Sequence, residues 1–447
     1  MIDRFFKLTS IDFHIGVTLL YRLWTIMAGG VLLIIVPLYM SENQQGYYFT
    51  FASIIGLQVF FELGFNYVIS QMISHEMAHL NIENKRVIKG REVNLNRLHS
   101  LLIMLKKWYI CIAVMFFVIV LPIGIYFFCE NPHLSMNEWL PAWTLIVIFT
   151  AMNLFISPFL SVLEGMGFVG DVALIRLVQS VIGYSLFFVF LILGYSLISV
   201  PFISGSAVII SAFYVFFVFR KLLFINAVIK QENKISWKKE IFPFQWRIAL
   251  SWLSGYFIFQ LFTPILFIHQ GAVEAGKLGL TLQIFTTLLT LSMSWMNAKG
   301  PIMGRLIAIN DRVSLNSMFI SLLIKSTLAN VILSTLFIFF YMVLKKYGFN
   351  FVDRISSLDV IYTLAFTTFM NHIIFSMALY MRAHKKEPML SNSITVGALT
   401  VLSILYFSRE SVIATIASYS LIITLVCFPW CCYLFIRYFK MEFSHGK

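Results

Sequence analysis

The chain consists largely of apolar segments that are long enough to cross a lipid bilayer, with short polar connections between them. A window of about twenty residues predicts twelve spans. These spans lie near residues 15–39, 46–74, 105–129, 140–163, 173–195, 199–221, 247–269, 277–298, 318–344, 358–381, 389–408 and 412–436. Because backbone groups inside a bilayer must be hydrogen-bonded within the protein, apolar runs of this length predict helices. We therefore expect an all-α integral membrane protein.

The composition excludes a protein that meets water on all sides. Apolar residues make up 60% of the chain and charged residues 12%, about half the charged content of an average soluble domain. The net charge of +13 would also suit a nucleic-acid-binding protein, but the basic residues lie in short loops between the spans. Membrane topology accounts for that placement, so we expect no nucleic-acid partner.

The Lys and Arg residues divide unevenly between the two sides of the predicted helices. The termini and the loops on their side carry roughly 26 of them, and the opposite loops about five. The segment 81–107 has seven basic residues, whereas the outer loops 41–46 and 130–138 contain no Lys or Arg. The positive-inside rule thus places both termini in the cytoplasm, with many passes across the membrane between them.

The chain divides into two halves of six spans, because a polar and basic segment follows the sixth span. We predict an N-terminal six-helix bundle at 1–225, a cytoplasmic linker at 226–244 and a C-terminal six-helix bundle at 245–447. In both halves an aromatic residue and an Arg mark the first span, and a glycine, Gly46 or Gly276, opens the second. Duplicated bundles around a central site are a common transporter design.

Glu62 is the only charged residue between Gly46 and Ser74 and lies near the middle of the second span. A carboxylate at that depth is costly unless it is protonated, paired or in a hydrated cavity. The pattern favours a transport pathway or proton relay, and the alternative is a structural partner for an embedded cation. His75 and Glu76, at the inner end of the same span, are expected to form an ordinary helix terminus.

Basic residues also lie within the spans or at their ends, all toward the cytoplasmic side. Each can reach lipid headgroups by snorkelling, which is the first interpretation. Together, cations from both halves would form a basic cavity suited to an anionic headgroup, which is the second. These residues are Arg22, Arg176, Arg247, Lys299 and Lys325.

Several spans also contain residues that weaken helices, which suits both a bending transporter and a static, kinked bundle. These residues are Gly29, Gly30, Pro37, Pro158, Pro264 and Pro429.

The chain shows no motif for catalysis or cofactor binding in a suitable context. Gly165, Gly167 and Gly170 form a GxGxxG pattern, but a transmembrane segment precedes them where a dinucleotide fold needs a strand. We expect a tight turn there. The five cysteines have no CxxC spacing, so we expect neither a metal site nor a disulfide. The sequence therefore predicts a protein that is not an enzyme and needs no cofactor.

Parts of both halves resemble one known family. The second span resembles the second-helix signature of the O-antigen flippases, the Wzx-type polysaccharide transporters of the multidrug/oligosaccharidyl-lipid/polysaccharide (MOP) exporter superfamily: GYYFTFASIIGLQVFFELGFNYVISQMISHEMAHL, at 46–80. Three further stretches are similar to the same family, at 157–179, 244–267 and 275–308.

This resemblance implies twelve transmembrane helices in two six-helix bundles around a central cavity, the MATE-like fold of this superfamily. It implies a flippase that moves an undecaprenyl-pyrophosphate-linked oligosaccharide from the cytoplasmic to the periplasmic leaflet of a bacterial inner membrane by alternating access. The partners would be this lipid-linked substrate and membrane lipids, with other polysaccharide-assembly proteins as candidates. A proton or sodium gradient would supply the coupling.

The resemblance also suggests roles for the embedded charges. Glu62 would be the coupling or gating carboxylate. Arg176, Arg247 and Lys299 lie in matching stretches and would contact the pyrophosphate. Arg22 and Lys325 lie outside these stretches and are added as candidates only because of their depth within the predicted spans. Two alternatives remain: a multidrug cation antiporter of the same fold, and a membrane-embedded polysaccharide-processing enzyme.

Overall fold

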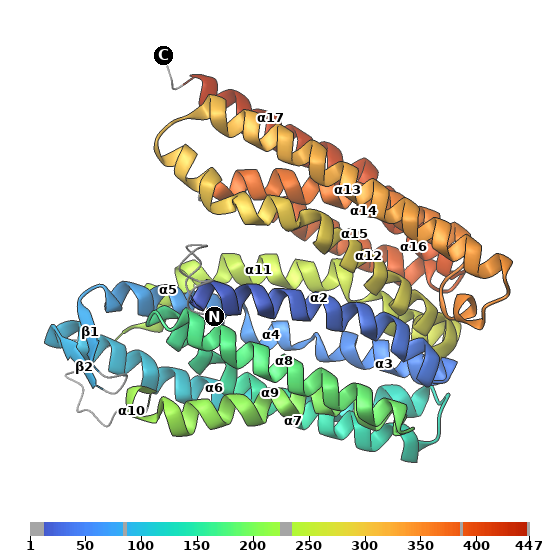
Figure 1. The fold of residues 1–447 in the computed structure, drawn as a ribbon, viewed down its shortest axis with the longest axis horizontal. Coiled ribbons are helices and arrows are strands. Elements are labelled where there is room, and N and C mark those ends of the chain that lie inside the picture. The colour runs from blue at the N-terminus through green and yellow to red at the C-terminus, as the bar shows by residue number, and fades with distance from the viewer. Residues whose placement is uncertain (1–12, 84–86, 224–234, 385–387, 445–447) are drawn as a thin grey trace, which may run out of the picture. The chain divides into compact units, whose positions relative to one another are not determined.

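The structure, a computed structural model, describes residues 13–83, 87–223, 235–384 and 388–444. This part of the chain is mostly helical, with one antiparallel hairpin of strands β1 (Leu80–Glu83) and β2 (Val87–Gly90). It falls into two compact units, one within 1–40 and 54–252 and the other within 41–53 and 253–447. Figure 1 labels the elements along the chain.

The elements before residue 224 are one hairpin and a series of helices. Besides the strands they are α2 (Phe13–Tyr39), α3 (Glu42–Ile55), α4 (Gln58–Glu62), α5 (Phe65–Met77), α6 (Glu92–Glu130), α7 (Met136–Gly165), α8 (Val169–Ile192), η1 (Ser196–Ser199), α9 (Pro201–Phe213), η2 (Tyr214–Val218) and α10 (Arg220–Leu223).

The elements after residue 234 are all helical. They are η4 (Trp237–Ile241), α11 (Phe242–Phe259), α12 (Phe262–Ala308), α13 (Arg312–Lys346), η5 (Asn350–Arg354), α14 (Leu358–Ala383), α15 (Leu390–Phe407), α16 (Val412–Ile422), η6 (Ile423–Cys427) and α17 (Phe428–Ser444).

Each unit is a bundle of helices packed side by side. In the first unit α2 packs against α8, α8 against α9, and α7 against α5, α6 and α9. In the second unit α12 packs against α13 and α14, and α14 also packs against α16 and α17 (Figure 1). Large aromatic side chains such as Trp139 and Trp143 are fully buried in the first bundle.

The structure accounts for the twelve predicted spans. In the described part of the chain, ten helical segments are long and apolar enough to cross a membrane, and the bent pair from α3 to α5 adds another. One of the ten covers 59 residues, which as one straight helix would measure about 88 Å, nearly three times the hydrocarbon thickness. Gly271, with φ 86° and ψ 172°, interrupts it and divides it into two spans.

The basic segment after the second span is more ordered than the predicted loop. Strand β1 pairs with β2 in the register Leu80 to Gly90, and α6 already begins at Glu92 rather than near residue 105. In the turn between α7 and α8, Gly167 has φ 94°. The tight turn expected for the glycine-rich segment is therefore present.

The second span is not the continuous helix that the sequence predicts. It breaks after Ile55 and again after Glu62, and its two arms are bent by 43°. Leu63 (φ 50°) and Gly64 (φ 68°) both lie in the left-handed region. That conformation costs a leucine about 1–2 kcal/mol. With no proline in the span, the sequence shows only the glycines as a signal for these breaks.

The sixth and the twelfth span each contain a π-helical turn. These turns are η2 in the sixth span and η6 in the twelfth, and each follows a regular helix, α9 or α16. A π-helical turn is rare and leaves backbone groups without regular partners. Its occurrence in corresponding spans agrees with the duplication inferred from the sequence.

Gly46 and Gly276, each of which opens the second span of its half of the sequence, lie against one another within the second unit. A Cβ on Gly46 would clash with the backbone carbonyl of Ala272, and a Cβ on Gly276 would lie 2.7 Å from the backbone nitrogen of Gly46. Gln45 Nε2 donates a hydrogen bond of 3.0 Å to the carbonyl oxygen of Gly276. This close crossing holds residues 41–53 in the second unit, whereas the sequence analysis assigned them to the N-terminal bundle.

We predict that Gly46→Ala destabilises the protein by about 1–3 kcal/mol, because the added methyl group meets backbone atoms that cannot rotate away. Thermal unfolding of the purified protein in detergent would show this as a fall in Tm. Gly255→Ala is the matched control, since a Cβ there meets nothing within 4 Å. Equal Tm values for the two variants would contradict the proposed crossing.

Candidate functional site

The second unit contains a cavity of about 510 Å³ that is lined by both polar and apolar side chains, with one charged residue among them. Its wall is formed by residues of α3, α12 and α14, together with the end of α11. Three side-chain amides line it, from Gln260, Gln283 and Asn297. The volume lies within the range of small-molecule sites in proteins.

Hydroxyl groups and aromatic rings also line this cavity, beside the apolar side chains of Ala52, Leu282, Leu289, Met293 and Leu379. The hydroxyls belong to Ser53, Thr263, Thr286 and Thr290. The aromatic rings belong to Phe49, Phe259 and Phe375. Amides and hydroxyls both donate and accept hydrogen bonds, and rings offer flat apolar faces, so the lining suits a polar ligand with apolar faces of its own.

Half of the eight polar side chains in this wall come from one face of α12. Gln283, Thr286, Thr290 and Asn297 are spaced by three, four and seven residues, which places them in one stripe along a helix. The stripe runs through a membrane span, where polar groups are costly unless they are hydrogen-bonded or face a cavity. The spacing of this stripe is visible in the sequence, but it was not among the predicted site residues.

The seventh span is broken where it meets the cavity. Helix α11 ends at Phe259 and α12 begins at Phe262, so Gln260 and Leu261 lie between them. Pro264 has no N–H group and therefore cannot donate the usual helical bond to the carbonyl of Gln260. The break confirms that Pro264 weakens this span. An interrupted helix of this kind is tolerated in a membrane where it lines a cavity.

Arg382 is the one ionisable residue among the residues that line the cavity, all of which lie in the described ranges. It lies in the last turn of α14, and Leu379 and Asn297 also line the cavity. Arg382 falls one residue beyond the predicted tenth span and was therefore not among the predicted cations within the membrane. Its guanidinium group can bind a phosphate or carboxylate through two parallel hydrogen bonds.

The structure does not place the predicted cations in this cavity. Arg22, Lys299 and Lys325 are exposed on α2, α12 and α13, and none of the three lines the cavity. In the first unit, Arg176 Nη2 lies 2.9 Å from Glu164 Oε1, and both side chains are partly exposed. The side chain of Arg247 lies outside the described residues. Substrate binding by these cations stays a prediction.

Glu62 lies in the first unit as the last residue of α4, next to the left-handed Leu63. Its side chain is partly buried, and among the described residues no hydrogen bond or ion pair reaches its carboxylate. The alternative interpretation of Glu62, a structural pairing with an embedded cation, is therefore not seen among the described residues. An ionised carboxylate here would have no fixed donor to offset its desolvation.

A short chain of polar groups follows the break in the second span. Tyr109 Oη donates to Asn66 Oδ1 at 3.1 Å, and Asn66 Nδ2 donates to Ser157 Oγ at 3.4 Å. These residues lie on α6, α5 and α7, so side chains of three helices are joined just beyond Glu62. The first unit thus holds a polar path inside its bundle.

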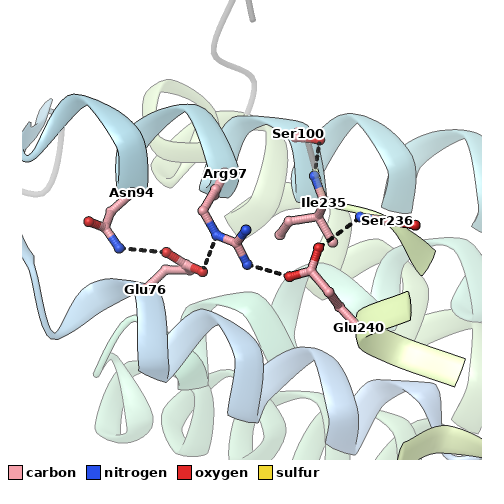
Figure 2. Close-up of polar contacts among 7 residues, drawn as sticks. All are labelled: Glu76, Asn94, Arg97, Ser100, Ile235, Ser236 and Glu240. Atoms are coloured by element: carbon pink, nitrogen blue, oxygen red, sulfur yellow. Dashed lines mark hydrogen bonds and ion pairs between the residues drawn. The ribbon is translucent and has the colours of Figure 1, made fainter. Parts of the chain in front are cut away.

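The second carboxylate of this segment, Glu76, is in a different situation (Figure 2). Its buried side chain accepts hydrogen bonds from Arg97 Nε at 2.8 Å and from Asn94 Nδ2 at 2.7 Å. Arg97 also pairs with Glu240 at 2.5 Å. Glu76 is therefore part of an ion-pair network, and not the ordinary helix terminus that the sequence analysis expected.

This network fastens the segment before α11 onto α6. Ser100 Oγ accepts a hydrogen bond from the backbone of Ile235, and Ser236 N–H donates to Glu240 (Figure 2). Burial raises the pKa of Glu240, but the Ser236 N–H and the Arg97 guanidinium outweigh burial and hold this pKa below its ordinary value. The contribution of Glu240 is therefore present above a pH of about 4.3 and is lost as the pH falls through the lowered pKa.

Comparison with known proteins identifies the fold through solved structures and not through sequence. No protein-family model and no curated protein matches the sequence. An inward-facing multidrug resistance MATE family transporter of the MOP superfamily superposes with a TM-score of 0.66 at 11% identity, over 97% of this chain and 99% of that one.

Two further transporter structures share the fold. The lipid II flippase MurJ, in an inward closed conformation, gives a TM-score of 0.64 at 11% identity, over 93% of this chain and 87% of that one. A MOP superfamily transporter from Pyrococcus furiosus, described as having a binding pocket of reverse polarity, gives 0.53 at 13% identity, over 95% and 96%. The predicted fold class is confirmed: the chain is a multi-pass membrane protein with the fold of MOP superfamily transporters. Its structural neighbours are transporters rather than enzymes.

We predict that Glu76→Gln destabilises the protein by about 1.5–3 kcal/mol, because a buried charge-assisted hydrogen bond is lost. A thermal unfolding scan of the purified protein should show a Tm several degrees lower. The control is Glu83→Gln, whose ion pair with Lys89 has more than half of each side chain exposed and is expected to contribute less than about 0.5 kcal/mol. A Tm unchanged in Glu76→Gln would contradict a stabilising network.

Proposed function

We propose that the protein is a flippase for an undecaprenyl-pyrophosphate-linked oligosaccharide, such as an O-antigen repeat unit. It would carry this substrate from the cytoplasmic to the periplasmic leaflet of a bacterial inner membrane by alternating access. The single observation that carries the proposal is the cavity of the second unit, with its amides, hydroxyls, aromatic rings and one arginine.

The lining of this cavity matches the chemistry of such a substrate. Sugar hydroxyls both donate and accept hydrogen bonds, as do the side chains of Gln260, Gln283 and Asn297. Phe49 and Phe259 offer faces for the apolar side of a sugar ring. Arg382 offers a cation for a phosphate group. The fold supports transport, since its neighbours include a protein named as a lipid II flippase.

Glu62 is the residue that we propose for coupling. It lies at a break in a membrane helix, and carbonyl groups at such breaks, together with a carboxylate, suit binding of a proton or a sodium ion. Binding of the ion at Glu62 would change the free energy of the two transporter conformations by different amounts, and would so shift the equilibrium between them. Arg22, Arg176, Arg247, Lys299 and Lys325 remain candidates for guiding the pyrophosphate.

A multidrug cation antiporter is the second candidate, because a MATE family transporter shares the fold. Such a transporter needs negative charge where its cationic substrate binds. The residues that line the cavity, all within the described ranges, include no Asp or Glu. The lining therefore favours the flippase.

We predict that deleting this chain from its host abolishes the surface polysaccharide and leaves lipid-linked repeat units on the cytoplasmic leaflet. Extraction of the lipid-linked units, combined with a probe that modifies only periplasmic sugars, would measure the distribution. Re-expression of the wild-type chain should restore the polysaccharide. Repeat units that still reach the periplasmic leaflet and only fail to polymerise would refute the proposal.

We predict that Glu62→Gln lowers the initial rate of flipping at least tenfold and removes its dependence on the ion gradient, because an amide cannot take up a proton and binds cations poorly. Flipping in proteoliposomes, with and without an imposed gradient, provides the measurement. Glu83→Gln, in the exposed hairpin, is the control and should behave as wild type. A gradient-dependent rate equal to wild type in Glu62→Gln would rule out coupling through this residue.

A further inference from the structure

We infer that the sugars held in the cavity of the second unit are uncharged, and that Arg382 binds the anionic group that links them to the lipid. This inference rests on the proposed function and goes further, since it names the class of glycan and its orientation. Its basis is the distribution of charge along the cavity wall.

The wall along α12 carries no charge over its whole length. From Gln283 to Asn297 the polar stripe measures about 21 Å, and its members are amides and hydroxyls. The other uncharged polar residues of the lining are Ser53, Gln260 and Thr263. A stripe of this length in a cavity of about 510 Å³ suits a short oligosaccharide rather than a single sugar.

A glycan with a carboxylate would be disfavoured against this wall. Its acidic sugar would leave water and meet neutral donors only, with no cation beside it except at the Arg382 end. Burial of a charge without a partner costs several kcal/mol, whereas sugar hydroxyls exchange water for amide and threonine partners at little cost. The lining therefore selects neutral sugars.

The one arginine fixes the direction in which the substrate lies. Asn297 is the last member of the stripe on α12, and Arg382 lies in the last turn of α14. Leu379 and Ala383, which flank Arg382, pack against a cluster that contains Met296, the neighbour of Asn297. The planar guanidinium fork binds phosphate oxygens in pairs, which a lysine does not do. Lys299 and Lys325 do not line the cavity. The phosphate end of the substrate thus belongs at Arg382, with the sugars along the neutral stripe.

The inference can be tested with two synthetic substrates in proteoliposomes. Both are polyprenyl-pyrophosphate-linked trisaccharides, one neutral and one in which a hexose is replaced by the corresponding uronic acid. Wild-type protein should flip the neutral substrate at least tenfold faster. Equal rates for the two substrates would overturn the selection of neutral sugars. If wild type flips neither substrate while a known flippase works in the same assay, the proposed function itself fails.

Adding a cation to the neutral stripe should change this preference. Gln283→Lys should raise the rate ratio of acidic to neutral substrate at least tenfold, and Thr290→Lys provides a second variant should the first not fold. Asn350→Lys adds the same charge at an exposed position of the same unit and should leave the ratio unchanged. An unchanged ratio in folded Gln283→Lys and Thr290→Lys would overturn the assignment of the stripe.

Arg382 is tested separately through binding of the neutral substrate. Arg382→Gln should raise the apparent KM at least tenfold, and Arg382→Lys should recover part of that loss because it keeps the charge but not the fork. Size-exclusion elution and Tm would confirm that both variants are folded. A wild-type KM in Arg382→Gln would overturn the role of this residue.

Discussion

The structure depends on one constraint, the absence of water in the hydrocarbon layer. Every backbone N–H and C=O that leaves a helix there must find another partner or face a cavity. Among the described residues, the backbone departs from helical geometry inside the spans at few places. Two of these places lie at residues that we propose to be functional. One is the break at Gln260, which the missing N–H of Pro264 produces and which lies in the cavity wall. The other is the pair Leu63 and Gly64, directly after Glu62.

The same constraint acts on polar side chains and explains their grouping. Four polar residues of α12 lie in one stripe along the cavity, which is a place where a membrane helix can hold polar groups at low cost: Gln283, Thr286, Thr290 and Asn297. Two carboxylates of the first unit differ in how their charge is accommodated. Glu76 is buried and held by Arg97 and Asn94, whereas Glu62 has no such partner among the described residues. A paired carboxylate stabilises a bundle, while an unpaired one is suited to binding an ion.

The sequence predicted much of the fold and less of the site. Hydropathy identified twelve spans, and Pro264 marked a real break, because both signals are local. The break after Glu62 was missed because the sequence there has no proline and the leucine in the left-handed region is held by its surroundings. Arg382 was missed because it lies just past the end of a predicted span. The sequence did not reveal that the segment 41–53 groups with the second unit, because the close approach of Gly46 to Gly276 joins residues far apart in the chain.

By itself the sequence determined that this protein crosses a membrane many times as helices, since hydrophobic length and backbone hydrogen bonding act within each segment. It also exposed the unusual charge at Glu62. The tertiary structure alone decided which polar groups share a wall, because Ser53, Gln260, Gln283 and Arg382 are far apart in the chain and meet only through packing. It also decided which carboxylate is paired. Both outcomes depend on neighbours that no local pattern records.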